Sequence, residues 1–306
     1  MTVRVRDVPL TEFAAALQQG AVFDYGAARV QVRSNVAALA GVLQDVYGAA
    51  PWPARQDFVD YHVQVVPGAG MRRWWSPQCR FLIDGVMPFD PFPLANALPL
   101  YEWGVNWCFA QRANHRVLLH AGVLARDGLG VILAAPPGSG KSTLSAALML
   151  RGFRLLSDEF GVLEPGAGRL HAMLKPVALK NASIAVIRDF SATARIGRTY
   201  PGTRKGDVAH LAPTDACFDA LREVARPALV VFPRFIAGRE LTCTVLSPED
   251  AFARLAFNSF NYPLLGRVAF DAVADVIETC VAVELVYDDL DAAIAQISSL
   301  LAQAAP

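Results

Sequence analysis

The sequence lacks an excess of charge of either sign, and it lacks paired cysteines. Its 28 Lys and Arg residues balance 28 Asp and Glu residues, so the chain has no global field of the kind that holds nucleic acid by phosphate neutralisation. The five cysteines are widely spaced and form no Cys-x-x-Cys pair, which argues against a zinc framework and a disulfide scaffold. We therefore expect no nucleic-acid partner and a reducing, cytoplasmic setting.

Long apolar segments are also missing. No stretch approaches the ~20 uncharged apolar residues that a membrane span requires, and residues 1–7 lack the apolar region of a secretion signal. We expect a soluble protein with no membrane partner. Of the 306 residues, 54% are hydrophobic and 18% are charged, which favours about two well-packed domains over disorder.

The spacing of apolar residues indicates two α/β parts. The first third predicts a small α+β unit with one helix and two strands, over residues 36–46, 58–66 and 74–83. Four prolines between Pro88 and Pro99 disfavour regular structure and precede an apolar helical segment over residues 100–111. We place the junction within residues 88–114 and predict an N-terminal α+β domain over 1–100 and a second domain over 101–306.

Beyond residue 115 the pattern alternates between strands and helices. Residues 117–124 and 131–135 predict a hairpin around the Asp127-Gly128 turn, and residues 142–150 predict a helix that Gly152 ends. Further elements are predicted as strands over 229–232, 241–246 and 281–287 and as helices beginning at Pro248, Leu264 and Leu290.

The segment Gly138-Ser139-Gly140-Lys141-Ser142-Thr143 matches the phosphate-binding P-loop, with Ala135 where the pattern usually begins with glycine. An apolar strand precedes it and a helix follows, so backbone amides and the positive helix terminus converge on one anion. We expect Lys141 to reach the β- and γ-phosphates and Ser142 to bind Mg²⁺. The alternative is a glycine-rich turn without a ligand, which does not require Gly-Lys-Ser at a helix start. The residues expected to bind the nucleotide are Pro137, Gly138, Ser139, Gly140, Lys141, Ser142 and Thr143.

Two adjacent acids, Asp158 and Glu159, end an apolar strand seventeen residues after Lys141. One short helix separates them from the P-loop, so the acids are expected near the γ-phosphate and its metal. Because neighbouring residues on extended backbone point in opposite directions, the two carboxylates are expected to do different work. One holds Mg²⁺ and the other takes the proton from an attacking hydroxyl.

The order of three motifs resembles the C-terminal domain of HPr kinase/phosphorylase, and more closely the group called HPr kinase-related kinase A. The motifs are Leu119-His120-Ala121-Gly122, the P-loop, and Leu155-Leu156-Ser157-Asp158-Glu159, within residues 115–287. The resemblance implies a P-loop kinase core of the HPr kinase/PEP carboxykinase type that uses ATP and Mg²⁺. It also implies Asp158 as the base, or as the acid in the reverse reaction, Glu159 as the metal ligand, and His120 as the histidine near the first acid. The family's second acid is usually Asp, and its Gly-Arg-Asn signature is not recognisable here, so HPr itself is not implied as the acceptor.

These observations favour a Mg-ATP-dependent kinase that phosphorylates a hydroxyl of a protein, a peptide or a small molecule. Residues 195–207 are expected to form a mobile basic loop in which Arg204 or Lys205 completes the charge clamp. The N-terminal domain is expected to recognise the acceptor or to build a homo-oligomer. A nucleotide-binding switch with weak ATPase activity is the second reading. A carboxykinase-like enzyme is disfavoured because no accompanying set of metal-binding His and Lys residues is found.

Overall fold

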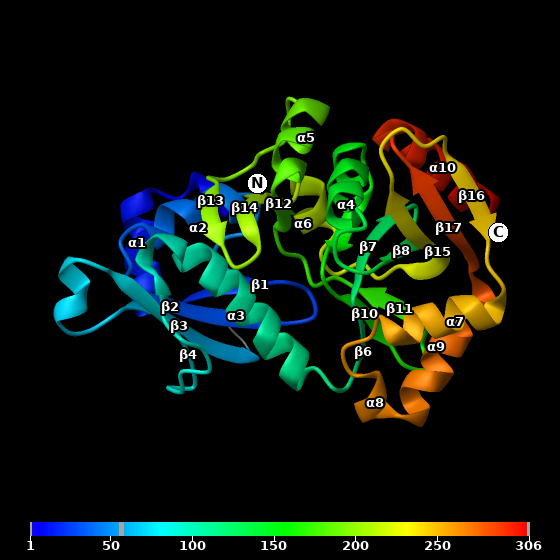
Figure 1. Cartoon of the computed structure of the whole chain (residues 1–306). Helices are drawn as coiled ribbons and strands as arrows, with labels where there is room; N and C mark the ends of the chain where they lie inside the picture. Colours follow the sequence, from blue (N-terminus) through cyan, green and yellow to red (C-terminus); the bar gives the residue numbers. More distant parts are fainter. Residues whose placement is uncertain (1, 55–57, 305–306) are drawn as a thin grey trace.

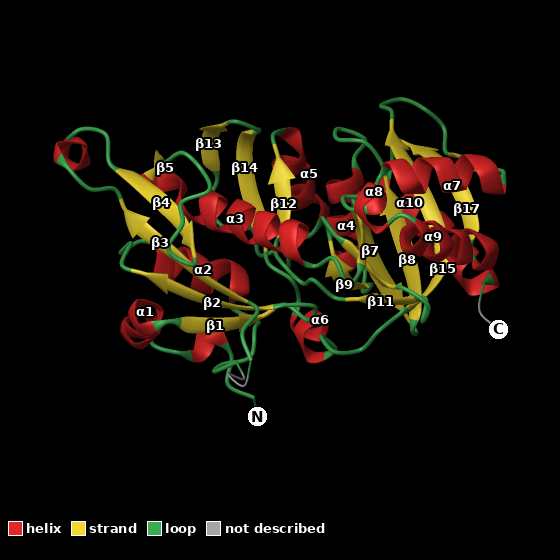
Figure 2. Ribbon diagram, turned by 90° about the horizontal axis from the view of Figure 1, so that it is seen from below, coloured by secondary structure: helices red, strands yellow, loops and turns green. Residues whose placement is uncertain are grey.

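Four β-sheets and the helices packed against them form the described part of the chain, residues 2–54 and 58–304 of a computed structural model. The fold is mixed α/β. Figures 1 and 2 show an N-terminal sheet at one end, a six-stranded sheet at the other, and a smaller sheet between them. Within these residues, no helix is both long and apolar enough to cross a membrane.

The N-terminal sheet has the order β1-β2-β3-β4-β5. In β2 and β4 buried and less buried side chains alternate, as expected for a sheet covered on one face. Helix α3 packs on β3 and β4; Gly104 allows this approach, since a Cβ there would lie 2.3 Å from the Phe81 ring. The elements are η1 (Val5–Asp7), α1 (Leu10–Gln19), β1 (Ala21–Asp24), β2 (Arg29–Ser34), α2 (Leu39–Tyr47), β3 (Tyr61–Pro67), η2 (Met71–Trp74), β4 (Gln78–Ile83), β5 (Phe92–Pro93), η3 (Leu94–Asn96) and α3 (Ala97–Arg112).

The six-stranded sheet has the order β16-β17-β15-β8-β7-β9. Strands β8, β15 and β17 are parallel, and β8 and β15 are buried almost throughout, as expected where helices cover both faces. Helix α4 packs on β7, β8 and β9, while α9 packs on β15. The elements are β7 (Ala121–Arg126), β8 (Leu129–Ala134), α4 (Lys141–Leu150), β9 (Arg154–Ser157), β15 (Arg226–Phe235), β16 (Thr242–Val245), α7 (Pro248–Phe257), α8 (Tyr262–Leu265), α9 (Arg267–Thr279), β17 (Val281–Tyr287) and α10 (Leu290–Gln303).

Two three-stranded sheets complete the fold, with the orders β11-β10-β6 and β12-β14-β13. The second lies between the two larger sheets (Figure 2). Their elements, with the two adjoining helices, are β6 (Val117–Leu119), β10 (Gly161–Glu164), β11 (Arg169–His171), β12 (Val177–Lys180), α5 (Ala182–Phe190), β13 (Tyr200–Thr203), β14 (Gly206–Leu211) and α6 (Asp215–Asp219).

Several sequence predictions are confirmed. The hairpin β7–β8 turns at Asp127 and Gly128, which both have positive φ. Helix α4 ends before Gly152, which has φ 91°. Ser247 begins α7, and its hydroxyl accepts a hydrogen bond from the Asp250 amide. The predicted boundary between residues 100 and 101 stays a prediction; α3 runs across this position.

Two predictions are wrong in detail. The strand expected over residues 117–124 is interrupted at His120, because β6 pairs with β10 whereas β7 joins the six-stranded sheet. Residues 195–207 are not simply a loop, because β13 and β14 form a hairpin whose tight turn is Arg204-Lys205. The same hairpin pairs with β12, so tertiary pairing orders a segment whose glycines and charges favour a loop.

Candidate functional site

The P-loop residues join β8 to the first turn of α4. Gly138 has φ 89° and Gly140 has φ 92°, a conformation that side chains other than glycine rarely adopt. A Cβ on Gly140 would also lie 2.9 Å from Tyr287 Oη and 3.0 Å from Phe235 Cβ. The first amides of α4 have no acceptor within the helix, so they are available to an anion at this end.

Lys141 begins α4 and is 8% exposed. Its Nζ lies 3.4 Å from the carbonyl oxygen of Asp158. Burial lowers the pKa of Lys141, while the carboxylates of Asp158 and Glu159 oppose this effect. The ammonium group is therefore held between the loop and the two acids.

The strand that carries the acids is not the immediate neighbour of β8. Strand β7 lies between them and is antiparallel to both, so β8 and β9 run parallel and end at the same edge of the sheet. At the end of β9 the hydroxyl of Ser157 accepts hydrogen bonds from the amides of Glu159 (3.3 Å) and Phe160 (3.0 Å). This turn projects the two acids from the strand end toward the P-loop.

Asp158 is buried, and its Oδ1 has no hydrogen-bond partner among the described residues. The same holds for Ser145 Oγ on α4. A Cβ on Gly122 would lie 2.5 Å from Ser145 Oγ and 3.7 Å from Asp158 Oδ1, so this glycine leaves the space beside both groups. Burial raises the pKa of Asp158, against the attraction of Lys141. A carboxylate with an unused oxygen and a raised pKa is suited to accept a proton.

Glu159 lies in a different electrostatic environment. Its side chain is 38% exposed, and its Oε1 lies 3.7 Å from His120 Nε2. Burial tends to raise the pKa of Glu159, but the surrounding cations, Lys141 first among them, hold it below its ordinary value. Burial and Lys141 in turn lower the pKa of His120. His120 therefore contacts Glu159, and its expected role beside Asp158 stays a prediction.

Two adjoining cavities meet at these acids. The first, here called the cradle cavity, has a volume of about 870 Å³ and is lined by residues 136–143, His120 and the β17–α10 connection. The second, here called the side cavity, has a volume of about 390 Å³ and lies between α3, the β12-β14-β13 sheet and the turn after β9. Glu159 lines both cavities, whereas Asp158 lines only the side cavity.

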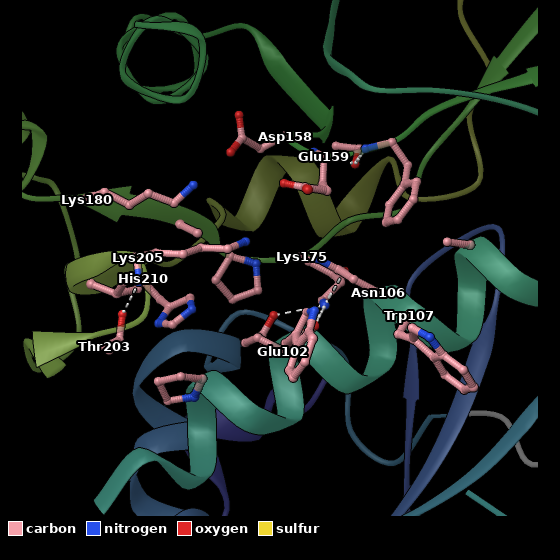
Figure 3. Close-up of a pocket in the computed structure, with 18 of the residues that line it drawn as sticks. Glu102, Asn106, Trp107, Asp158, Glu159, Lys175, Lys180, Thr203, Lys205 and His210 are labelled. Atoms are coloured by element: carbon pink, nitrogen blue, oxygen red, sulfur yellow. Dashed lines mark hydrogen bonds and ion pairs between the residues drawn. The ribbon is translucent and has the colours of Figure 1, made fainter. Parts of the chain in front are cut away.

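Two lysines from the middle sheet also line both cavities. Figure 3 shows Lys180, at the end of β12, and Lys205, at the hairpin turn, extending toward the space below the acids. Arg204 lines the side cavity but not the cradle cavity, and its guanidinium lies 5.9 Å from the centroid of the Phe92 ring. Of the two cations considered from the sequence, Lys205 is the one that borders the P-loop.

Sequence reasoning missed the residues that arrive from distant segments. Tyr287 and Asp288 line the cradle cavity at the end of β17, where an acid after an apolar strand was an available signal. Glu102, Lys175 and His210 line the side cavity. They come from α3, from the segment before β12 and from β14, and no motif links them.

The residues at the cradle fit a magnesium nucleotide. Ser142 and Glu159 line the same cavity, and Ser139 Oγ is buried without a partner among the residues that the structure describes. Among the described residues, no group of three or more His, Cys, Asp or Glu side chains could hold a metal ion. Magnesium in phosphate sites commonly uses one or two protein ligands and completes its shell with phosphate oxygens and water.

Comparison with known proteins gives a remote likeness among solved structures. No family model and no curated protein matches the sequence. Among solved structures, the HPr(Ser) kinase/phosphatase from Coxiella burnetii is similar at 15% identity, with a TM-score of 0.27, covering 61% of this chain and 94% of that chain. A likeness this remote carries no functional weight, so the function proposed below rests on the geometry of the site.

Proposed function

We propose that the protein is a P-loop phosphotransferase that moves the γ-phosphoryl group of Mg-ATP to a hydroxyl. The observation that carries this proposal is that Lys141 of the P-loop lies among the two acids. Its Nζ is 3.4 Å from the Asp158 backbone carbonyl, and both carboxylates act on its pKa. Glu159 lines both cavities, and Asp158 lines the side cavity. One cavity suits a nucleotide and the other leaves room for an acceptor. A protein that only held a nucleotide would not need a buried carboxyl group with an unpaired oxygen in a residue that borders the second cavity.

Each residue has a distinct task in this proposal. The amides at residues 138–143 and the ammonium of Lys141 bind the phosphates and neutralise charge that develops during transfer. The Ser142 hydroxyl and Glu159 hold the metal, which when bound supplies charge to the phosphate oxygens. His120 positions Glu159 through their 3.7 Å contact. Lys180 and Lys205 add positive charge at the junction of the cavities.

Asp158 is the proposed general base. It accepts the proton of the acceptor hydroxyl as the hydroxyl oxygen forms a bond to the γ-phosphorus. The bond between that phosphorus and the β,γ-bridging oxygen breaks, and ADP is released. Burial favours the protonated form of the carboxyl, so the proton has a stable position at the end of the transfer.

The test uses ATP labelled at the γ-phosphate, Mg²⁺ and a cell extract as the source of acceptors. We expect label in a discrete acceptor with the unchanged protein and none with Lys141→Ala or Asp158→Asn. The control is Arg267→Ala, which removes an exposed cation on α9. Label found only as inorganic phosphate, at a rate that Asp158→Asn leaves unchanged, would overturn the proposal in favour of a nucleotide-dependent switch.

A further inference from the structure

The side cavity has a composition that restricts what can bind there. It adjoins the cradle cavity where Glu159, Lys180 and Lys205 border both, while the P-loop residues 136–143 line the cradle cavity alone. A molecule in the side cavity therefore meets Asp158 without occupying the phosphate cradle. Its volume of about 390 Å³ suits a small ligand or one large side chain.

Much of its wall is apolar, and aromatic rings form one part of it. Trp103, Trp107 and Ala110 recur on α3 with helical spacing and face the cavity. Phe160 and Phe260 line it as well, with their ring centroids 4.8 Å apart. Walls of this kind bind apolar or aromatic bodies by burial and ring packing.

The charged groups beneath these rings are already satisfied. Lys175 Nζ lies 3.1 Å from Glu102 Oε2 and 2.6 Å from Asn106 Oδ1 (Figure 3). Tyr47 donates a further hydrogen bond to Glu102. Since these charges neutralise each other, they do not call for a charged ligand at this end. Burying a further unpaired charge here would be costly.

One polar atom in the cavity wall is unused. His210 is 3% exposed, and its Nδ1 is buried without a hydrogen-bond partner in the described part of the chain. Burial lowers the pKa of His210, so the imidazole is favoured in its neutral form. A turn of the ring would bring Nδ1 to a polar group on a bound molecule; a buried polar atom that stays unpaired costs free energy.

We propose that the side cavity holds the phosphoryl acceptor, a hydroxy compound with an aromatic or bulky apolar body and a second polar group. The reacting hydroxyl lies at Asp158, the body packs against Trp103 and Trp107, and the second polar group hydrogen-bonds to His210. This inference rests on the proposed function for the reaction, but its binding geometry is testable alone. Transfer forms the bond between the acceptor oxygen and phosphorus, breaks the bond to the leaving oxygen of ADP, and moves the hydroxyl proton to Asp158.

The apolar portion of the acceptor can belong to a free compound or to a residue of a peptide. A third cavity of about 360 Å³ shares Phe92, Trp103 and Arg204 with the side cavity and provides a path for a longer molecule. The probes are therefore 2-(4-hydroxyphenyl)ethanol and the blocked tripeptide acetyl-Gly-Tyr-Gly-amide, with myo-inositol as the polyol without an apolar body. Binding is measured by calorimetry and ligand-observed NMR in the absence of nucleotide, so its outcome is separate from that of ATP use.

We expect one or both aromatic probes to bind and myo-inositol not to bind. Trp107→Ala should weaken probe binding about tenfold or more, because a ring contact and its buried area are lost. Ala110→Phe should have the same effect by filling the cavity from α3, and it guards against misfolding of the first variant. Trp75→Ala is the matched control, since Trp75 is 68% exposed and lines none of the three cavities.

The outcomes distinguish a free compound from a peptide as the acceptor, and they test this inference separately from the proposed function. Binding of the tripeptide alone assigns the acceptor to a polypeptide, and binding of the free compound supports a small molecule. Failure of both aromatic probes, preference for myo-inositol, or unchanged binding in both cavity variants would overturn the inference. Mg-ATP binding should stay within twofold in Ala110→Phe; an equal loss of nucleotide binding would show that the side cavity belongs to the nucleotide site. If Lys141→Ala left Mg-ATP binding intact, the proposed function would fail while the probe result stood.

Discussion

Replacing Asp158 with Asn should make the nucleotide-free protein more stable and inactive. The carboxyl is 7% exposed, and its Oδ1 has no hydrogen-bond partner among the described residues. The pKa of this carboxyl is raised despite the attraction of Lys141, so burial disfavours the ionised form more than Lys141 favours it. The neutral amide keeps the shape and removes that charge, so we expect a gain of about 1–3 kcal/mol at pH 7, the scale of an imperfectly compensated buried polar group. For domains of 150–250 residues each kcal/mol corresponds to about 2–4 °C in Tm.

The pH dependence gives the sign of this effect. Burial raises the pKa of Asp158 in the folded protein above its ordinary value of 3.8. The carboxyl therefore favours the folded state below its unfolded pKa, and this contribution is lost as the pH rises through the folded pKa. The gain in unfolding free energy from Asp158→Asn should be smallest below the unfolded pKa. It should grow as the pH rises from the unfolded to the folded pKa and be constant above that.

Urea unfolding of both proteins at a series of pH values measures the difference. Phosphoryl transfer should fall about 10²- to 10⁴-fold if the carboxylate is the general base, while Mg-ATP binding is retained. Asp275→Asn, at an exposed position on α9, is the matched control. A variant no more stable than the unchanged protein at pH 7 would refute the reasoning about the buried carboxylate, and retained transfer would refute its role as base.

Three further predictions concern the surroundings of the site. Lys175→Met should destabilise the fold by about 3–5 kcal/mol, because it leaves the buried Glu102 carboxylate uncompensated, and adding Glu102→Gln should recover much of the loss in urea unfolding. Gly122→Ala should lower the free energy of unfolding by about 1–3 kcal/mol, because its Cβ would lie 2.5 Å from Ser145 Oγ. Adding Ser145→Ala should recover part of this loss in thermal unfolding, and a double variant that recovers none would contradict the clash. Hydrogen bonds from a neighbouring guanidinium and imidazole lower the pKa of Glu164 to about 2. The difference in unfolding free energy between the unchanged protein and Glu164→Gln should therefore be constant above pH 4.5 and shrink as the pH falls toward 2. A difference that does not change with pH in urea titrations would rule this out.

Local chemistry was enough to anticipate the parts of the site that are continuous in the chain. Glycines with positive φ, the lysine at the start of α4 and the helix end before Gly152 follow from backbone preferences within a few residues. The acids after β9 were also expected near the P-loop. Short separation along the chain limits where such segments can lie, which is why these expectations agree with the structure.

Pairing between distant strands decided what the motifs could not. One strand was expected over residues 117–124, but β6 pairs with β10 and the strand is broken at His120, whose ring contacts Glu159. Residues 195–207 were expected to form a loop, but β14 pairs with β12 and forms a hairpin with β13. In this hairpin Lys205, not Arg204, lines the cradle cavity.

The amino-acid sequence by itself determined the P-loop, the acidic pair and the turns around them, because each depends on the conformations that a few neighbouring residues allow. Only the tertiary structure decided that Glu102, Lys175 and His210 line one cavity beside Asp158. These residues come from α3, the segment before β12 and β14, and their proximity arises from burial of side chains far apart in the chain. No local preference encodes such a contact, so the candidate acceptor site became visible only after the sheets were packed together.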